Sequence, residues 1–325
     1  MGENWLRKPE WFWNPSEGEP DFVHQWVRPL EQGEGEPDLI LFGAPISRSS
    51  ISVSGASLYP QEFRKMWKSY ATYNLDEDLD LTPFHVADAG DVAMHTTNIS
   101  ESHKRIQESC AYLSRQYPET ALCMIGGDHS TTACAVRGIK ETFPEETIGI
   151  LQLDTHLDVR DPAELGPANG TPIRQLIDGG VVKGDNVYNI GLHGYFNARP
   201  LISYAKEKRI RMVTLKQARE KGVPAAVNEA IDRLSEKAGI IYVTVDMDVL
   251  DITQAPGVPA STPGGMTTTE LFGALMEIGK REEVRYIDFV CLDPTKDSAV
   301  SETVKAGVYA WMQFVTGRVM GSGKG

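Results

Sequence analysis

Short apolar segments rich in β-branched residues recur along the chain and alternate with segments of helical periodicity. Strands that are apolar on both faces are typical of a parallel sheet with helices on both sides. We therefore predict a single α/β domain of three layers, α/β/α, with a mostly parallel sheet. Strands are predicted at residues 39–43, 121–125, 148–153, 187–190, 240–245 and 284–291. Helices are predicted near residues 100–115, 131–142, 172–179, 199–208, 222–237, 269–280 and 301–316.

The domain is predicted to span residues 38–320, because no internal repeat and no linker divides this stretch. Residues 1–37 are rich in Trp, Pro and Glu. We expect them to form an N-terminal arm that packs on the domain or on a neighbouring subunit. Residues 321–325 read Gly-Ser-Gly-Lys-Gly and are expected to form a flexible tail.

The net charge of −13 disfavours two classes of partner. Nucleic acid requires a basic surface to neutralise its phosphates, and an anionic membrane surface attracts basic segments. No apolar run approaches the length of a membrane span. The four cysteines form no CxxC pair and are too sparse for a disulfide framework, which favours a reducing compartment. We therefore expect a cytoplasmic protein that binds neither nucleic acid nor membrane.

Three of the predicted strands are followed directly by acids and histidines. Their sequences are Gly126-Gly127-Asp128-His129-Ser130, Asp154-Thr155-His156-Leu157-Asp158 and Asp246-Met247-Asp248. Ligands of open parallel sheets bind beyond the carboxyl ends of the strands, where several loops converge. Taken singly, each segment has an ordinary interpretation as a loop histidine, a helix cap or a turn.

Taken together, the three segments predict a metal site. Alternate residues of an extended segment point to the same side, so the side chains of each D-x-H-x-D or D-x-D segment face one point. Four carboxylates gathered without a cation would repel one another and lose their hydration. A donor set of four aspartates and two histidines suits Mn²⁺ better than a thiolate-binding metal. The candidate ligands are His129, Asp154, His156, Asp158, Asp246 and Asp248. The residues alone leave the number of ions open.

The segments GGDHS, DTHLD and VDMDVLDITQAPGVPASTPGG resemble, in order and spacing, three signature segments of the ureohydrolase family of arginases, agmatinases and formimidoylglutamases. The resemblance implies two Mn²⁺ per subunit and a homo-oligomer, either a trimer or a hexamer. It implies that Asp158 is catalytic, with a free oxygen that holds the proton of an attacking hydroxide. One ion would be held by His129, Asp154, Asp158 and Asp246, and the second by Asp154, His156, Asp246 and Asp248.

Two further segments are most similar to the formimidoylglutamase branch of the family. Asp158-Val159-Arg160 is similar to the Asp-Val-Arg or Asp-Leu-Arg of that branch, and residues 166–172, GPANGTP, resemble its asparagine- or serine-containing loop. Asn169 stands where arginases and agmatinases have a histidine that shuttles protons, and an amide does not titrate.

That branch implies hydrolysis of the amidine N-formimidoyl-L-glutamate to L-glutamate and formamide, a step of histidine degradation. A substrate with two carboxylates requires cations, and arginine pairs with carboxylate in bidentate geometry. Arg160 is the favoured anchor, and Arg48, Asn169 and Arg174 lie in loops expected at the mouth of the site. A surface or structural ion pair is the alternative interpretation for each arginine.

One position departs from the family pattern. Where the family usually has Glu-Val-Asn-Pro or Glu-Val-Asp-Pro, this chain reads Cys291-Leu292-Asp293-Pro294. The family's glutamate pairs with the cationic nitrogen of the substrate, and cysteine does not replace that charge; Asp293 and Asp297 are the nearby acids that could. We expect Cys291 to be buried and inert.

Two alternatives stay open. An agmatinase or a guanidino-acid hydrolase would release urea, although agmatine has no carboxylate and gains nothing from Arg160. A non-catalytic, metal-stabilised binding protein would explain Asn169 and Cys291 as traces of a lost activity.

Overall fold

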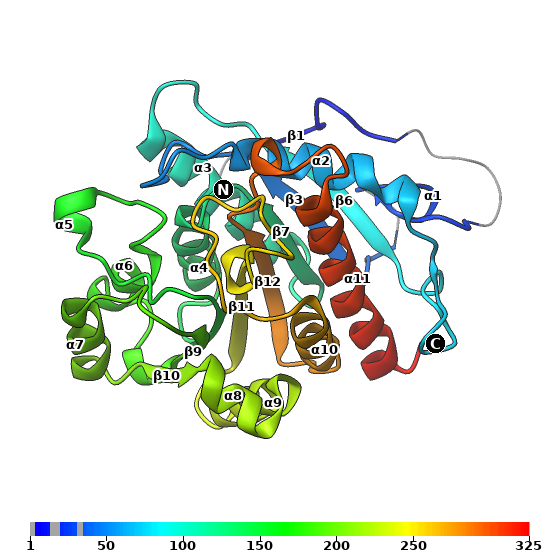
Figure 1. The fold of residues 1–325 in the computed structure, drawn as a ribbon. Helices are drawn as coiled ribbons and strands as arrows, with labels where there is room; N and C mark the ends of the chain where they lie inside the picture. Colours follow the sequence, from blue (N-terminus) through cyan, green and yellow to red (C-terminus); the bar gives the residue numbers. More distant parts are fainter. Residues whose placement is uncertain (1–3, 14–19, 31–34, 325) are drawn as a thin grey trace.

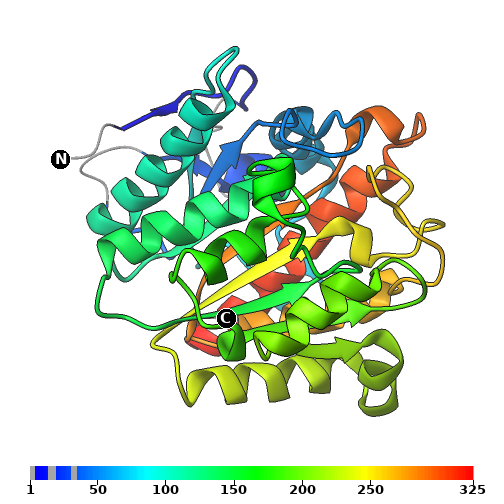
Figure 2. The same ribbon diagram turned by 90° about the vertical axis from the view of Figure 1, so that its left-hand side faces the viewer.

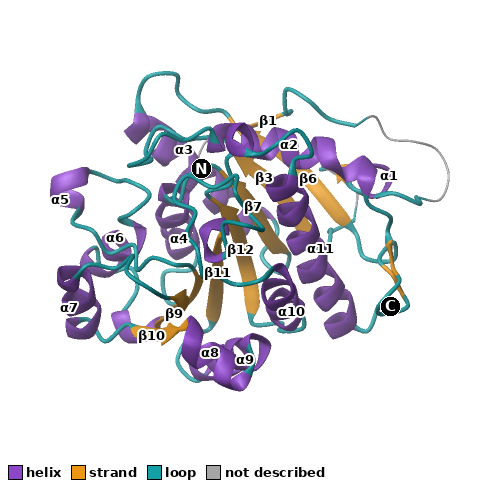
Figure 3. Ribbon diagram, in the orientation of Figure 1, coloured by secondary structure: helices purple, strands orange, loops and turns teal. Residues whose placement is uncertain are grey.

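The computed structural model describes residues 4–13, 20–30 and 35–324. Within these ranges, one sheet has the order β1-β6-β3-β7-β12-β11-β8-β9-β10, with β2 beside β6. Its pairs are parallel except β1 with β6, so the predicted three-layer α/β/α fold with a mostly parallel sheet is confirmed (Figures 1 and 3). The strands are β1 (Leu6–Arg7), β2 (Arg28–Pro29), β3 (Leu39–Ala44), β6 (Val86–Val92), β7 (Ala121–Gly126), β8 (Ile148–Leu153), β9 (Val187–Leu192), β10 (Arg211–Thr214), β11 (Ile240–Asp246) and β12 (Val284–Val290). A separate hairpin pairs β4 (Tyr73–Asn74) with β5 (Leu79–Asp80).

The helices form two layers, one on each face of the sheet. Figure 1 shows α3 and α4 on one side of the strands and α10 and α11 on the other, and Figure 2 shows α3 and α4 lying side by side. Among the described residues, none of the helices combines the length and apolar character that a membrane span needs. The helices are α1 (Val23–Trp26), α2 (Tyr59–Met66), α3 (Ile99–Gln116), α4 (Ser130–Thr142), α5 (Pro162–Leu165), α6 (Pro172–Asp178), α7 (Arg199–Glu207), α8 (Leu215–Lys221), α9 (Val223–Ser235), α10 (Thr268–Gly279) and α11 (Glu302–Ser322).

Alternation along the strands divides the core into two parts. In β3, Leu39 and Leu41 belong to the same buried cluster as the inner faces of α9, α10 and α11. Ile40 and Phe42 point the other way and pack with residues of α3, α4 and α6. Successive side chains of a strand face opposite sides of a sheet, so a strand covered on both sides must be apolar throughout.

The apolar pattern missed β6, because this strand contains two acids. Asp88 and Asp91 form ion pairs of 2.7 Å each with Arg64 of α2, whose side chain is only 1% exposed. The desolvation cost of a buried guanidinium is offset here by two carboxylates and by a hydrogen bond to the Gly90 carbonyl. An internal ion pair of this kind allows a sequence with two acids to form a strand inside the sheet.

The described parts of the N-terminal arm pack on the domain, through β1 and β2 against β6. Trp26 is 5% exposed, and its ring centroid lies 6.2 Å from that of Trp311 in α11. Residues 1–3, 14–19 and 31–34 of the predicted arm lie outside the described residues. At the other end, α11 continues to Ser322, so the first two residues of the predicted tail are helical, and residue 325 lies outside the described residues.

Candidate metal centre

Strand order brings the acidic segments together. The central strands lie in the order β7-β12-β11-β8, and all of them run parallel. His129 follows β7, Cys291 follows β12, Asp246 ends β11 and Asp154 follows β8. Because the carboxyl ends of parallel strands share one edge of the sheet, these four segments meet at one place.

His129 is surrounded by three carboxylates. Its Nδ1 atom lies 2.7 Å from Oδ2 of Asp158, 3.1 Å from Oδ2 of Asp246 and 3.4 Å from Oδ2 of Asp154. The imidazole and the Asp154 carboxylate have no exposed surface, and the other two side chains are at most 10% exposed. These four residues offer ligand atoms that all lie within 4.8 Å of one another, which is the arrangement of a first cation position.

A second group adjoins the first and shares one residue with it. Nδ1 of His156 lies 2.8 Å from Oδ2 of Asp248 and 3.6 Å from Oδ1 of Asp154. Asp154 therefore contributes one oxygen to each group, and its Oδ2 also accepts a hydrogen bond of 2.6 Å from Gln152. The structure thus brings together all six side chains that the sequence singled out, in two adjoining groups.

The pKa shifts of the cluster reflect how closely its buried carboxylates and imidazoles lie together. Burial and the neighbouring Asp248 raise the pKa of Asp246 to about 6, and burial with the other carboxylates raises the pKa of Asp154 well above its ordinary value. Burial opposes a charged imidazole at His156, but Asp248 and Asp154 outweigh it and raise that pKa to about 12. These directions show that the buried carboxylates crowd negative charge into one place, which a cation would stabilise.

The donor atoms fit hard or borderline cations. Nε2 of His129 lies 2.9 Å from Oγ1 of Thr244, while the buried Nδ1 atom has no partner with hydrogen-bond geometry among the described residues despite three carboxylates nearby. A metal-binding histidine typically has one ring nitrogen without a hydrogen bond, facing the ion, and the other nitrogen held by a neighbouring residue. His129 has this arrangement. Oxygen donors with two imidazoles suit Mn²⁺ among the divalent ions.

Buried polar residues beneath the cluster orient His129. Thr244 lies 3.3 Å from Thr132, whose hydroxyl donates to Asp288 at 2.7 Å, and Tyr242 donates to the same Asp288 oxygen at 2.6 Å. No sequence motif marks these residues, because a threonine or aspartate inside a strand has no characteristic neighbours in the sequence. The available signal was polarity at Thr244 and Asp288, inside otherwise apolar predicted strands.

Two backbone features shape the site. Asp158 has a φ of 52°, in the left-handed region that a residue with a side chain rarely adopts. At Gly127 an added Cβ would lie 1.7 Å from the carbonyl oxygen of Ile46, so the loop that carries His129 requires glycine at this point.

A cavity of about 110 Å³ opens onto the cluster. Arg160 and Asn169 lie in its lining, and no hydrogen bond or ion pair of the Arg160 guanidinium is found among the described residues. Asn169 is held in place, since its side-chain Oδ1 accepts from the Ile51 backbone N–H at 2.8 Å and its backbone N–H donates to the Ser49 carbonyl at 2.9 Å. The lining also includes Phe196 and Asn197, which the sequence analysis did not single out.

Two predicted substrate-binding arginines do not reach this cavity. Arg174 forms ion pairs with Asp161 at 2.8 Å and Asp178 at 3.1 Å, which leaves its guanidinium engaged within α6 and the loop before it. Arg48 donates to the backbone carbonyls of His95 and Thr96. Neither lines the cavity, so the alternative interpretation of a structural contact applies to both.

The acids beside Cys291 are also engaged elsewhere. Asp293 accepts from the amides of Gly55 at 2.8 Å and Thr295 at 3.0 Å, and Asp297 accepts from the amide of Thr303 at 3.0 Å. Neither lines the cavity, so neither replaces the charge of the family's glutamate there. Cys291 itself is buried, as expected, but it lines the cavity beside the cluster.

The loop that holds Asn169 depends on a buried neutral histidine. Nε2 of His103 lies 3.2 Å from Oγ of Ser49 and 2.9 Å from Oγ of Ser130. Burial, assisted by the charge of Arg137, lowers the pKa of His103 from 6.5 to about 4. Above pH 6.5 the imidazole is neutral in both folded and unfolded chains. Between pH 6.5 and 4 only the unfolded chain takes up the proton, so stability is lost as the pH falls.

We expect this histidine to cost about 3 kcal/mol of stability between pH 6.5 and pH 4. The measurement is the free energy of unfolding of chelator-treated protein against pH, for the wild type and for His103→Gln, whose side-chain amide forms hydrogen bonds but does not titrate. The variant is expected to lose about 3 kcal/mol less than the wild type over this window. Equal losses would show that His103 is protonated in the folded chain.

Comparisons with known proteins agree with this geometry. The model of the arginase family matches residues 37–317, and the chain therefore belongs to this family. It is a hydrolase of amidine carbon–nitrogen bonds. A formimidoylglutamase of Halalkalibacterium halodurans is 37% identical over 282 residues, which cover 87% of this chain and 88% of that protein. The formimidoylglutamase of Bacillus subtilis is 35% identical over 79% of this chain and 80% of its own length.

Solved structures show the same fold. The crystal structure of formimidoylglutamase from Bacillus subtilis superposes with a TM-score of 0.87 at 30% identity, covering 96% of each chain. A Trypanosoma cruzi formiminoglutamase crystallised with Mn²⁺ has a TM-score of 0.82 at 22% identity over 92% of this chain and 99% of that one, which shows the fold alone. The predicted resemblance to the formimidoylglutamase branch is thus confirmed.

Proposed function

We propose that this protein hydrolyses N-formimidoyl-L-glutamate to L-glutamate and formamide, with two Mn²⁺ per subunit. The observation that carries the proposal is one cavity that joins the carboxylate cluster to the Arg160 guanidinium, which has no hydrogen bond or ion pair among the described residues. A cation centre at one end of the cavity suits attack on an amidine carbon, and an arginine at its mouth suits a carboxylate of the same substrate. The relatives at 35–37% identity that are named formimidoylglutamases support this choice of substrate.

The two adjoining groups would each hold one ion. His129, Asp154, Asp158 and Asp246 would hold the first, and Asp154, His156 and Asp248 would hold the second, with Asp246 as a further ligand that the family resemblance implies. When bound, the two metal ions supply a nucleophile from water at neutral pH and stabilise negative charge in the transition state. The Mn²⁺ in the related Trypanosoma cruzi crystal structure supports this choice of metal.

The residues of the chain position the substrate and move protons. Asp158 would hold the proton of the attacking group on its free carboxylate oxygen, and its position 2.7 Å from the buried His129 keeps that carboxylate inside the cluster. Arg160 would bind a carboxylate of the substrate by a pair of charge-assisted hydrogen bonds. Asn169, fixed by the loop at Ser49 and Ile51, would direct its Nδ2 amide group as a donor toward the substrate.

Metal depletion and restoration test the proposal. Protein stripped by a chelator is expected to be inactive on N-formimidoyl-L-glutamate, and Mn²⁺ at two ions per subunit is expected to restore glutamate and formamide formation. Protein that binds two ions per subunit but forms no glutamate would contradict the proposed substrate. Assembly into a homo-oligomer, a role in histidine degradation and a place in the cytoplasm remain predictions from the sequence.

Metal binding is also expected to stabilise the fold. An ion that binds only the folded chain contributes about 2.7 kcal/mol at a concentration 100 times its Kd. For a chain of this size that corresponds to a Tm increase of roughly 4 °C per ion. Differential scanning calorimetry with and without Mn²⁺ measures the increase, and an unchanged Tm at saturating Mn²⁺ would show that the cluster does not bind the ion.

A further inference from the structure

We propose that Cys291 is a metal ligand, so that its sulfur adds a soft donor to the cation position of His129 and Asp246. The inference rests on the metal centre of the proposed function and extends it with a seventh protein ligand. It predicts that this site prefers Zn²⁺ and Co²⁺ over Mn²⁺ more strongly than a site made only of aspartate and histidine.

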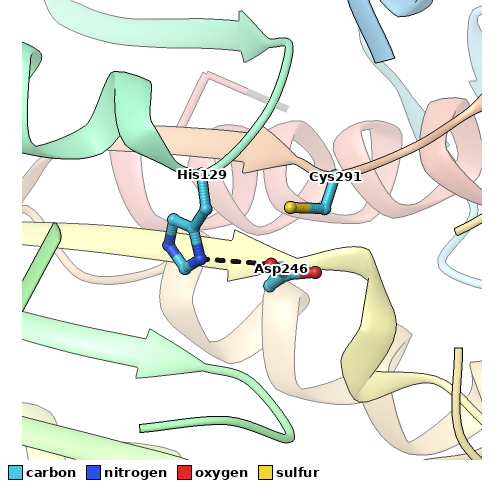
Figure 4. A group of neighbouring side chains, drawn as sticks. All are labelled: His129, Asp246 and Cys291. Atoms are coloured by element: carbon cyan, nitrogen blue, oxygen red, sulfur yellow. Dashed lines mark ion pairs between the residues drawn. The ribbon is translucent and has the colours of Figure 1, made fainter. Parts of the chain in front are cut away.

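Cys291 lies close to two of the candidate ligands. The ligand atoms of His129, Asp246 and Cys291 all lie within 4.8 Å of one another, and all three residues are buried. Figure 4 shows the Cys291 sulfur on the side of this residue that faces the His129 ring, with the Asp246 carboxylate below both in this view. The chain has three other cysteines, all of them free and buried, and none belongs to such a group among the described residues.

The Nδ1 nitrogen of His129 faces the same cation position. Nδ1 of His129 is fully buried and lacks a hydrogen-bond partner among the described residues, which independently indicates a ligand at this point. A cation bound by this nitrogen and by Asp246 would lie near Cys291, because β12 lies between β7 and β11.

The backbone of Cys291 has an unusual conformation. Cys291 has a φ of 64°, in the left-handed region, and its amide donates to the Gly127 carbonyl at 2.8 Å. A left-handed conformation at a residue with a side chain costs on the order of 1 kcal/mol or more. The strained residue thus lies at the carboxyl end of β12, between the strands that carry the other two ligands.

The chemistry of coordination is balanced without any further reactant. The S–H bond of Cys291 breaks, its proton leaves to the buffer, and the sulfur electron pair forms the bond to the ion. Thiolate sulfur binds Zn²⁺ at about 2.3 Å, and imidazole nitrogen binds it at about 2.0–2.1 Å. Sulfur donors favour the softer metals, whereas carboxylate oxygens accept Mn²⁺ readily.

X-ray absorption of the zinc-loaded wild type tests the proposal without any substitution. With two Zn²⁺ per subunit, we expect one sulfur scatterer for every two zinc ions, at about 2.3 Å. Spectra that require only nitrogen and oxygen neighbours would overturn the inference while leaving the proposed metal centre intact. Failure to bind zinc stoichiometrically would contradict both.

Cobalt spectra and metal competition assign the sulfur to this residue. The Co²⁺-loaded wild type is expected to show a sulfur-to-cobalt charge-transfer band that is lost in Cys291→Ser and kept in the matched control Cys123→Ala, a buried cysteine within β7. The preference for Zn²⁺ over Mn²⁺, measured by competition, is expected to fall at least about tenfold in Cys291→Ser. A band that persists in Cys291→Ser, or an unchanged preference, would contradict the assignment.

Discussion

Replacing Asp246 with asparagine is expected to remove metal binding and to lower kcat/KM by at least about 10³-fold, which corresponds to about 4 kcal/mol of transition-state stabilisation. Asp246 ends β11 with Oδ2 at 3.1 Å from His129 Nδ1, and its side chain is only 4% exposed. It would contribute to both cation positions. A neutral amide at this position removes one negative charge from the cluster that binds the two dications. Metal content by elemental analysis and steady-state kinetics measure the two effects.

The matched control is Asp251→Asn, in the same segment of the chain. Asp251 accepts from the amides of Thr253 and Gly264, which fold the following loop, and it belongs to neither metal-binding group. This variant is expected to retain two ions per subunit. Normal metal content in Asp246→Asn would contradict the proposal that Asp246 contributes to both cation positions, whatever the activity of the variant.

Replacing Arg160 with alanine is expected to raise KM for N-formimidoyl-L-glutamate roughly 10- to 100-fold, because a charge-assisted hydrogen bond to a carboxylate contributes about 1.5–3 kcal/mol. The metal content and the fold are expected to be unchanged, since the guanidinium has no ion pair or hydrogen bond among the described residues. Arg160→Lys should recover part of the loss, because an ammonium group keeps the charge but not the bidentate geometry.

Arg174→Gln is the control for Arg160→Ala. Arg174 lies in the same region of the chain, but it pairs with Asp161 and Asp178 and does not line the cavity. Its replacement is expected to leave KM within about twofold of the wild type. An equal increase of KM in both variants would indicate a general effect of positive charge and would contradict a direct contact from Arg160.

The sequence predicted what depends on local pattern. The apolar runs before Asp154 and Asp246 predicted β8 and β11 closely, because a strand buried on both faces admits few polar residues. The same logic placed acids and histidines at strand ends. Their grouping could be predicted from a general rule of parallel sheets, without knowledge of the strand order.

What the sequence did not predict depends on contacts between distant segments. The position of Cys291 follows from β12 lying between β7 and β11, an order that alternating patterns do not encode. The strand β6 was missed because Arg64, from a different element, balances its acids. Arg48 and Arg174 were expected at the site because their loops lie near the predicted ligands, but side-chain direction is set by local partners.

The most direct test of the account is a side-by-side product analysis of the Mn²⁺-loaded protein with N-formimidoyl-L-glutamate, agmatine and guanidinobutyrate. We expect L-glutamate and formamide in equal amounts from the first substrate and no urea from the other two. Urea from agmatine or guanidinobutyrate, with no formamide from N-formimidoyl-L-glutamate, would contradict the proposed substrate and the role assigned to Arg160.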